Sequence, residues 1–369
     1  MDRYAWLGCE VLTMKWLDLL HRWTGGVIGL VLGLLGLTGC LLVWKTALIT
    51  VPGKALPLVR DPAAVAAAVQ RMLPQPKGGE SVIFADNGFA LHQLRLAHGA
   101  GAYADQGGRI VERWSSQWER PELWLFDFHH HLFASDIGET VIGIAGLCGL
   151  FFVVSGTILW WRTRRTFKWR MLPKRLSRPA IVMHHRDLGI VVAPLLLLSS
   201  ITGAAMVFRP VAMIVVAPFG SPAKALAALR PGKVHGGPLA ASPPWRAMLT
   251  AASQRFPDAV PRILSVPRKP GDPITLRMRR ADEWLPNGRT TLTFDAATGR
   301  LLTSRDAMAM PQAARVYNML YPLHAGRVGG VAWKLLMTVS GLALTLLGSL
   351  AVWTFWFRRP RRPIRPSRV

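Results

Sequence analysis

The chain has 369 residues, 51% of them hydrophobic, and carries a formal net charge of +25. Its apolar runs of about 20 residues or more can cross the ~30 Å hydrocarbon core of a bilayer, which indicates an integral membrane protein and excludes a soluble one. The positive charge clusters at the ends of these runs instead of lining one domain, so nucleic acid is not an expected partner.

Four membrane spans are predicted in chain order. They cover residues 18–44, 138–161, 185–208 and 332–357. The first run is too long for a signal-peptide core and lacks a small-x-small cleavage site, so we expect it to remain as an anchor. The predicted fold is therefore a mainly α membrane protein with a four-helix transmembrane bundle.

The segments between the spans differ in length and charge. The loop 162–184 and the tail 358–369 are short, rich in arginine and free of acidic residues. The positive-inside rule places both in the cytoplasm, together with the two termini. The longer segments 45–137 and 209–331 are then expected in the periplasm, which places the chain in a bacterial inner membrane with lipid headgroups as contacts.

Each periplasmic segment is predicted to be an α+β domain, with one helix against a small antiparallel sheet. The helices are expected at 61–73 and 244–256. Strand-like runs follow at 81–84, 90–96 and 109–114 in the first segment, and at 263–266, 274–279, 290–294 and 300–303 in the second. An Asp-led turn with glycine recurs at Asp105 and Asp295. The chain thus reads as two repeats, each with a span, a domain and a span.

Histidines are duplicated with the spans. His21-Arg22 opens the first span and His185-Arg186 opens the third, and in both a glycine follows the histidine by four residues and a Thr-Gly pair by seventeen. A histidine at the edge of a bilayer is costly unless it has a partner or a task. Two such histidines in duplicated helices suggest a shared ligand, which we infer to be haem.

A second histidine set precedes the other two spans, with His129 to His131 before the second and His324 before the fourth. Because alternate spans run in opposite directions, His21 and His185 are expected at the cytoplasmic surface and the second set at the periplasmic surface. Two facing imidazoles form a bis-His haem site suited to electron transfer, which predicts two haem b groups. Successive helical residues point ~100° apart, so one or at most two of these three histidines can face the bundle. His129 is favoured as the ligand, and His131 is its rival.

Other residues beside these histidines fit the same interpretation. Arg22, Arg186 and Arg327 stand where haem propionates would emerge, although each could instead anchor lipid headgroups. Five glycines could thin the helix faces for a flat macrocycle or serve close helix packing: Gly25, Gly26, Gly29, Gly33 and Gly189.

The remaining histidines are expected to have no role in haem binding. His184 departs from the His21 register and is predicted to face headgroups. Three histidines in the periplasmic segments are predicted to lie on the surface: His92, His98 and His235.

These patterns together resemble the PepSY-associated transmembrane family. Four motifs carry the resemblance: Leu20-His21-Arg22-Trp23, His129-His130-His131-Leu132-Phe133, His185-Arg186-Asp187-Leu188-Gly189 and Leu323-His324-Ala325-Gly326. The helix with an Asp-x-x-Thr-Gly hairpin is similar to a PepSY domain. The resemblance implies two PepSY-like domains, and it includes the ferric-siderophore reductases of the FoxB type, which are similar to diheme cytochromes b.

The expected function is transmembrane electron transfer to a periplasmic ferric siderophore, which would release Fe(II). No Rossmann or Walker motif is present, so the electron donor would be another molecule, and no acid-base catalytic residue is expected. Two alternatives stay open: a haem-free, membrane-anchored PepSY protein that binds or regulates a peptidase, and a quinol-oxidising cytochrome b that serves a periplasmic protein. Small residues in the spans would permit a homodimer.

Overall fold

The computed structural model describes residues 3–230, 232 and 234–357, and within 3–13 only the backbone. The described chain forms two compact units. A helical unit contains the residues up to Leu41, His129–Phe208 and the residues from Leu335 on. A sheet unit contains Leu42–Phe128 and Arg209–Lys334.

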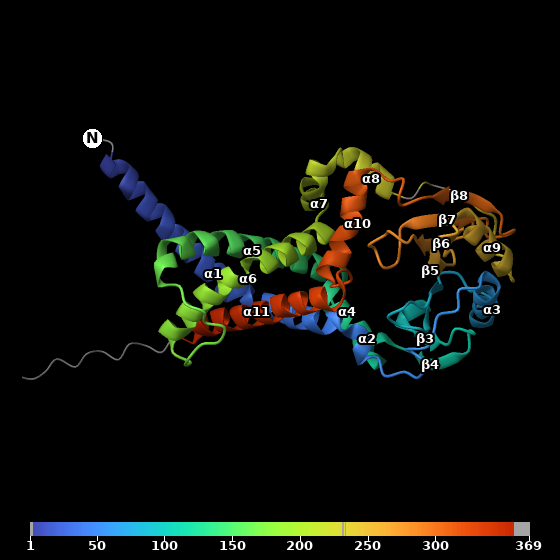
Figure 1. Ribbon diagram of the computed structural model, residues 1–369, viewed down its shortest axis with the longest axis horizontal. Coiled ribbons are helices and arrows are strands. Elements are labelled where there is room, and N and C mark those ends of the chain that lie inside the picture. The colour runs from blue at the N-terminus through green and yellow to red at the C-terminus, as the bar shows by residue number, and fades with distance from the viewer. Residues whose placement is uncertain (1–2, 231, 233, 358–369) are drawn as a thin grey trace, which may run out of the picture. The chain divides into compact units, whose positions relative to one another are not determined.

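The helical unit is built on four long helices: α1 (Arg3–Val43), α5 (Ser135–Thr163), α6 (Arg178–Val207) and α11 (Gly330–Trp356). All four are long and apolar enough to cross a membrane, as predicted. Figure 1 shows α1 and α6 running in one direction and α5 and α11 in the other. Most of the helices extend beyond the predicted spans, because polar residues at their ends continue the helix outside the apolar run.

Small residues let these helices approach closely. A Cβ atom added at Gly36 of α1 would lie 2.5 Å from the carbonyl oxygen of Gly341 in α11. On α5, a Cβ atom at Gly146 would lie 3.3 Å from Ala204 of α6. Membrane helices associate through such packing, because lipid supplies no hydrophobic force between them.

The sheet unit holds one antiparallel sheet of eight strands in the order β4-β3-β2-β1-β5-β6-β7-β8. The strands are β1 (Ser81–Ile83), β2 (His92–Arg95), β3 (Gly101–Ala104), β4 (Ile110–Trp114), β5 (Val260–Ser265), β6 (Ile274–Arg279), β7 (Thr290–Phe294) and β8 (Leu301–Arg305). The two halves of the chain join where Val82 of β1 faces Leu264 of β5. They therefore share one sheet instead of forming separate sheets, since pairing β1 with β5 removes two open strand edges.

Two helices form the core of this unit with the strands (Figure 1). Helix α3 (Pro62–Met72) is capped by Asp61, whose carboxylate accepts a hydrogen bond from the Ala64 N–H, and α9 (Trp245–Arg255) packs beside it. Both helices lie within a residue or two of their predicted bounds. His92 is 4% exposed in this core, so the prediction of a surface residue was wrong for His92, while His98 and His235 are exposed.

Shorter helices connect these elements. They are α2 (Lys45–Leu48), α4 (Pro121–His131), α7 (Arg209–Val216), α8 (Pro222–Leu229) and α10 (Gln312–His324), with 3₁₀ turns η1 (Ala97–Gly99), η2 (Gln117–Glu119), η3 (Arg164–Thr166) and η4 (Ala217–Phe219). The α7–η4–α8 segment is apolar enough to pass for a broken fifth span, with a bend of 116°, and the sequence did not predict it. Helices α4 and α10 each end at a candidate histidine.

Candidate functional site

His21 of α1 and His185 of α6 meet within the helical unit. Their ring centres are 6.2 Å apart and their planes are nearly perpendicular, at 88°. Two imidazoles bound to one metal through nitrogens at about 2 Å would have ring centres about 6 Å apart. The spacing of this pair would therefore allow both histidines to bind one metal ion.

Ser155 of α5 sets the tautomer of His21. The Ser155 hydroxyl donates to the carbonyl oxygen of Phe151 at 2.6 Å and lies 2.8 Å from His21 Nδ1. A hydroxyl has only one hydrogen, so His21 Nδ1 must be the donor in the second contact. The lone pair of the His21 ring is then on Nε2, the nitrogen that would bind a metal.

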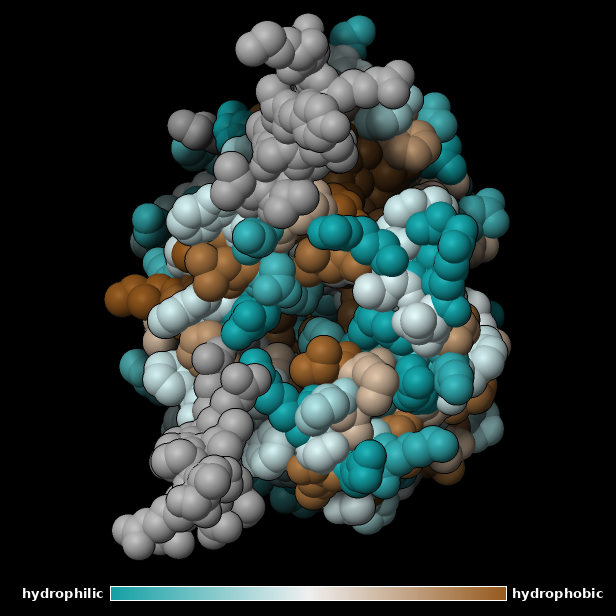
Figure 2. All heavy atoms as spheres, turned by 90° about the vertical axis from the view of Figure 1, so that its left-hand side faces the viewer, coloured by the Kyte–Doolittle hydropathy of each residue, from teal (hydrophilic) through white to brown (hydrophobic). Residues whose placement is uncertain are grey.

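The surroundings of this pair include open space. A Cβ atom added at Gly189, one turn after His185, would meet nothing within 4 Å, and one at Gly25 would only reach atoms 4.0 Å away. Figure 2 faces this end of the bundle and shows a hollow at its centre with hydrophilic side chains around it. Two of the other glycines serve packing, because Cβ atoms at Gly26 and Gly29 would press on Phe355 and Val352 of α11.

Sequence reasoning missed a buried polar cluster beside His185. His184 is fully buried, with Nδ1 2.9 Å from the carbonyl oxygen of Arg170, so it does not face headgroups. Asp187 is also fully buried and forms ion pairs with Arg170 and Arg186. Arg186 further donates to Thr166 at 2.7 Å, so these contacts attach the segment 166–170 to α6.

Arg22 and Arg186, the two arginines beside these histidines, have different surroundings. Arg186 is held by Asp187, so a haem propionate would have to compete with an existing ion pair. Among the residues whose side chains are described, Arg22 pairs only with the exposed Asp18, at 3.4 Å, and such pairs contribute little stability. Arg22 therefore remains the more accessible of the two cations.

Thr38 holds His129 at the opposite end of α1 in the same way as Ser155 holds His21. The Thr38 hydroxyl donates to the carbonyl oxygen of Leu34 at 2.9 Å and lies 2.8 Å from His129 Nδ1. Nδ1 is again the donor, which puts the lone pair of His129 on Nε2. This contact joins His129 to α1 and fixes the orientation of its ring.

His324 and Arg327 belong to the sheet unit. His324 is the last residue of α10, and the indole N–H of Trp333 donates to the neighbouring carbonyl of Leu323 at 2.9 Å. His324 and His129 lie in different units, so their pairing stays a prediction from the sequence.

Arg327 contributes to a basic region of the sheet unit. Burial, together with the charges of Arg327 and Arg95, lowers the pKa of Lys45 to about 8. Among the described residues, none of these three cations forms an ion pair. The region is therefore suited to an anionic group, such as a haem propionate or the carboxylate of a chelate.

The described residues contain no group of three or more His, Cys, Asp or Glu side chains that could hold a metal ion. A haem iron needs only two protein ligands, since the macrocycle supplies the other four. His21 and His185 are two side chains of the kind that such an iron requires.

Comparison with known proteins agrees with the motifs. The family model described as the PepSY-associated TM region matches residues 19–359. No curated protein matches the chain.

Proposed function

This chain belongs to the PepSY-associated transmembrane family, and from that premise we propose that it is an inner-membrane diheme b-type oxidoreductase. It passes electrons across the membrane to a periplasmic ferric siderophore and releases Fe(II). The termini and the loop 162–184 face the cytoplasm, and the sheet unit faces the periplasm. The observation that carries the proposal is the His21–His185 pair, with ring centres 6.2 Å apart.

In this proposal four histidines hold two haem b groups. His21 and His185 bind one iron at the cytoplasmic side, while His129, or His131 in its place, and His324 bind the other at the periplasmic side. Bound haem supplies reversible one-electron chemistry, and two histidine ligands leave no open position for oxygen.

The protein's own residues prepare these sites. Ser155 and Thr38 keep Nδ1 of their histidines protonated, so that Nε2 is ready for a metal. His21 and Thr38 are seventeen residues apart on α1, so the two ends are separated by about 25 Å along the helix axis. That separation suits two sites near opposite faces of one membrane.

A ferric chelate is the proposed electron acceptor because reduction is an effective way to release its iron. Hard oxygen ligands hold Fe(III) far more tightly than Fe(II), so reduction loosens the chelate without an acid or base catalyst. Lys45, Arg95 and Arg327, which form no ion pair within the part of the chain that the structure describes, would attract an acidic chelate to the sheet unit. The donor is a quinol or a cytoplasmic reductant.

Anaerobic stopped-flow spectroscopy tests this function. The purified protein is reduced with dithionite, freed of excess reductant and mixed with ferric citrate or a ferric hydroxamate, with ferrozine present to trap Fe(II). We expect about one Fe(II) for each haem reoxidised. His324→Ala should lose this reaction, whereas the control His235→Ala should keep it. A reduced protein that no ferric chelate reoxidises would contradict the proposal.

A further inference from the structure

The α7–α8 hairpin, defined as Arg209–Leu229, has an inner face that packs within the sheet unit. Val216 of α7 and Ala225 of α8 are fully buried against Ala313 and Ala314 of α10. The bend is made at Gly220, where φ is +135°, a conformation that favours glycine. The hairpin is therefore a fixed element of the fold.

Its outer face is apolar and exposed. Ile214 is 74% exposed and Phe219 is 43% exposed, and they are accompanied by the exposed Pro218. The hairpin begins two residues after Val207, the end of the membrane-spanning helix α6. An apolar face that follows a span so directly is typical of a helix lying in the membrane interface.

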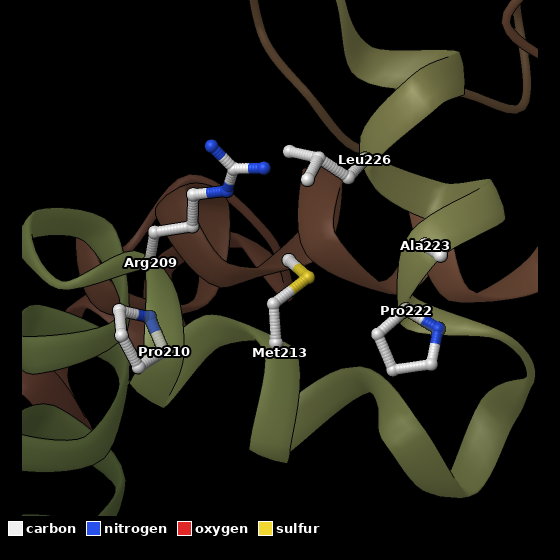
Figure 3. A pocket seen from close by; sticks show the side chains of 6 residues that line it. All are labelled: Arg209, Pro210, Met213, Pro222, Ala223 and Leu226. Atoms are coloured by element: carbon white, nitrogen blue, oxygen red, sulfur yellow. The ribbon is translucent and has the colours of Figure 1, made fainter.

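A pocket of about 340 Å³ lies between the two helices of the hairpin. Its lining is almost entirely apolar: Pro210, Met213, Pro222, Ala223 and Leu226. Figure 3 shows the Met213 side chain pointing into the space between α7 and α8, with the Arg209 guanidinium on the side of Leu226. Arg209 is exposed and forms no ion pair among the described residues.

We propose that the α7–α8 hairpin lies in the lipid interface and that its pocket binds an anionic phospholipid of the surrounding bilayer. The Arg209 guanidinium binds the lipid phosphate, for which its planar set of donors is suited. An acyl chain lies along Met213 and Leu226, which removes their apolar surface from water. This site is independent of the histidine pairs and does not need haem.

Lipid retention tests the pocket. The full chain is moved from nanodiscs of equal phosphatidylcholine and phosphatidylglycerol into mild detergent, and the lipids that remain bound are counted by native mass spectrometry. We expect phosphatidylglycerol to be retained by the wild type and by the control Lys224→Gln, whose side chain is outside the pocket lining. Retention should fall about fivefold in Arg209→Gln, since one basic residue contributes ~1 kcal/mol to anionic lipid binding.

Depth-dependent quenching tests the placement of the hairpin. A bimane label is attached at Ile214→Cys, or at the control position Gln254→Cys on α9, after Cys9, Cys40 and Cys148 have been replaced by alanine. Brominated lipid should quench the label at position 214. Iodide, which stays in water, should quench the label at position 254. Equal quenching of both labels by iodide, or unchanged phosphatidylglycerol retention in Arg209→Gln, would overturn the proposal.

Discussion

At the scale of single residues, two hydroxyl groups determine which ring nitrogen of His21 and of His129 carries the hydrogen. Ser155 and Thr38 each use their one hydrogen on a helix carbonyl, so the histidine beside each must donate from Nδ1. Hydrogen bonds of this kind orient metal-binding imidazoles and raise their basicity. His21 and His129 are thus each held by a hydroxyl group at Nδ1, although Ser155 belongs to α5 and Thr38 to α1.

Replacing Ser155 by alanine should weaken haem binding at the His21 site. Removing the acceptor of the Nδ1 hydrogen bond leaves the ring free to turn and to change tautomer, and losses of this kind lower metal affinity by about 10- to 100-fold. Haem titration of the apoprotein measures the effect. Thr157→Ala is the control, because the Thr157 hydroxyl also donates to a carbonyl of α5 but contacts no histidine; equal affinities in the two variants would refute the role of Ser155.

His92 should make the stability of the sheet unit depend on pH. Its Nδ1 accepts a hydrogen bond from the Ala85 N–H at 3.1 Å, and burial lowers the pKa of His92 from 6.5 to about 4. Because the folded-state pKa is the lower one, the unfolded chain takes up a proton first as the pH falls. Stability is therefore complete above pH 6.5 and decreases down to pH 4, by about 3 kcal/mol in total.

Pulse proteolysis of the full chain in urea, at several pH values, measures this loss. His92→Gln keeps an acceptor for Ala85 but cannot titrate, so its stability should change less between pH 6.5 and pH 4 than that of the wild type. The exposed His98 provides the control, and His98→Gln should keep the wild-type profile. A pH profile that is the same in all three proteins would show that His92 is not the titrating group.

At the scale of elements, the bundle depends on small residues where α1 crosses α11. A Cβ atom at Gly36 would lie 2.5 Å from the carbonyl oxygen of Gly341, whereas one at Gly25 would lie no closer than 4.0 Å to any neighbour. Adding a methyl group should therefore disturb the packing of α1 at Gly36 but not at Gly25.

Gly36→Ala should destabilise the helical unit, because the two backbones must move apart to admit the methyl group, a change that typically costs about 1–3 kcal/mol. Gly25→Ala, which also replaces glycine by alanine in α1, should leave stability unchanged or slightly higher. Thermal denaturation in detergent, followed by near-UV circular dichroism, compares the two. Equal melting temperatures would show that the α1–α11 crossing is looser than described.

Helices and strands that follow from the hydropathy pattern of their own segment could be predicted from the sequence. Features that depend on contacts with distant segments could not. The four spans and the strands β6 and β7 lie where hydropathy and alternation place them, since each pattern is contained within its own segment. The α7–α8 hairpin was missed because two short helices joined by a bend give no single periodic run. Ser155 was missed because a serine in an apolar span has the same signal whether it packs or binds histidine.

At the scale of the whole molecule, our proposal is that each half of the chain supplies one ligand to each haem. The single sheet could not be foreseen, because the pairing of β1 with β5 joins residues far apart in the chain. The burial of His184 and His92 likewise depends on neighbours from distant segments. Within the helical unit, the predicted partners His21 and His185 do meet.

The central claim, that His21 and His185 hold one haem together, is tested most directly by haem counting. Pyridine-haemochrome assays should give two haem b per chain for the wild type and for the control His98→Ala. His21→Ala and His185→Ala should each lose one haem, and the double variant should lose the same single haem, because the two ligands serve one iron. A colourless wild-type protein, or a double variant that loses both haems while each single variant loses one, would contradict the account.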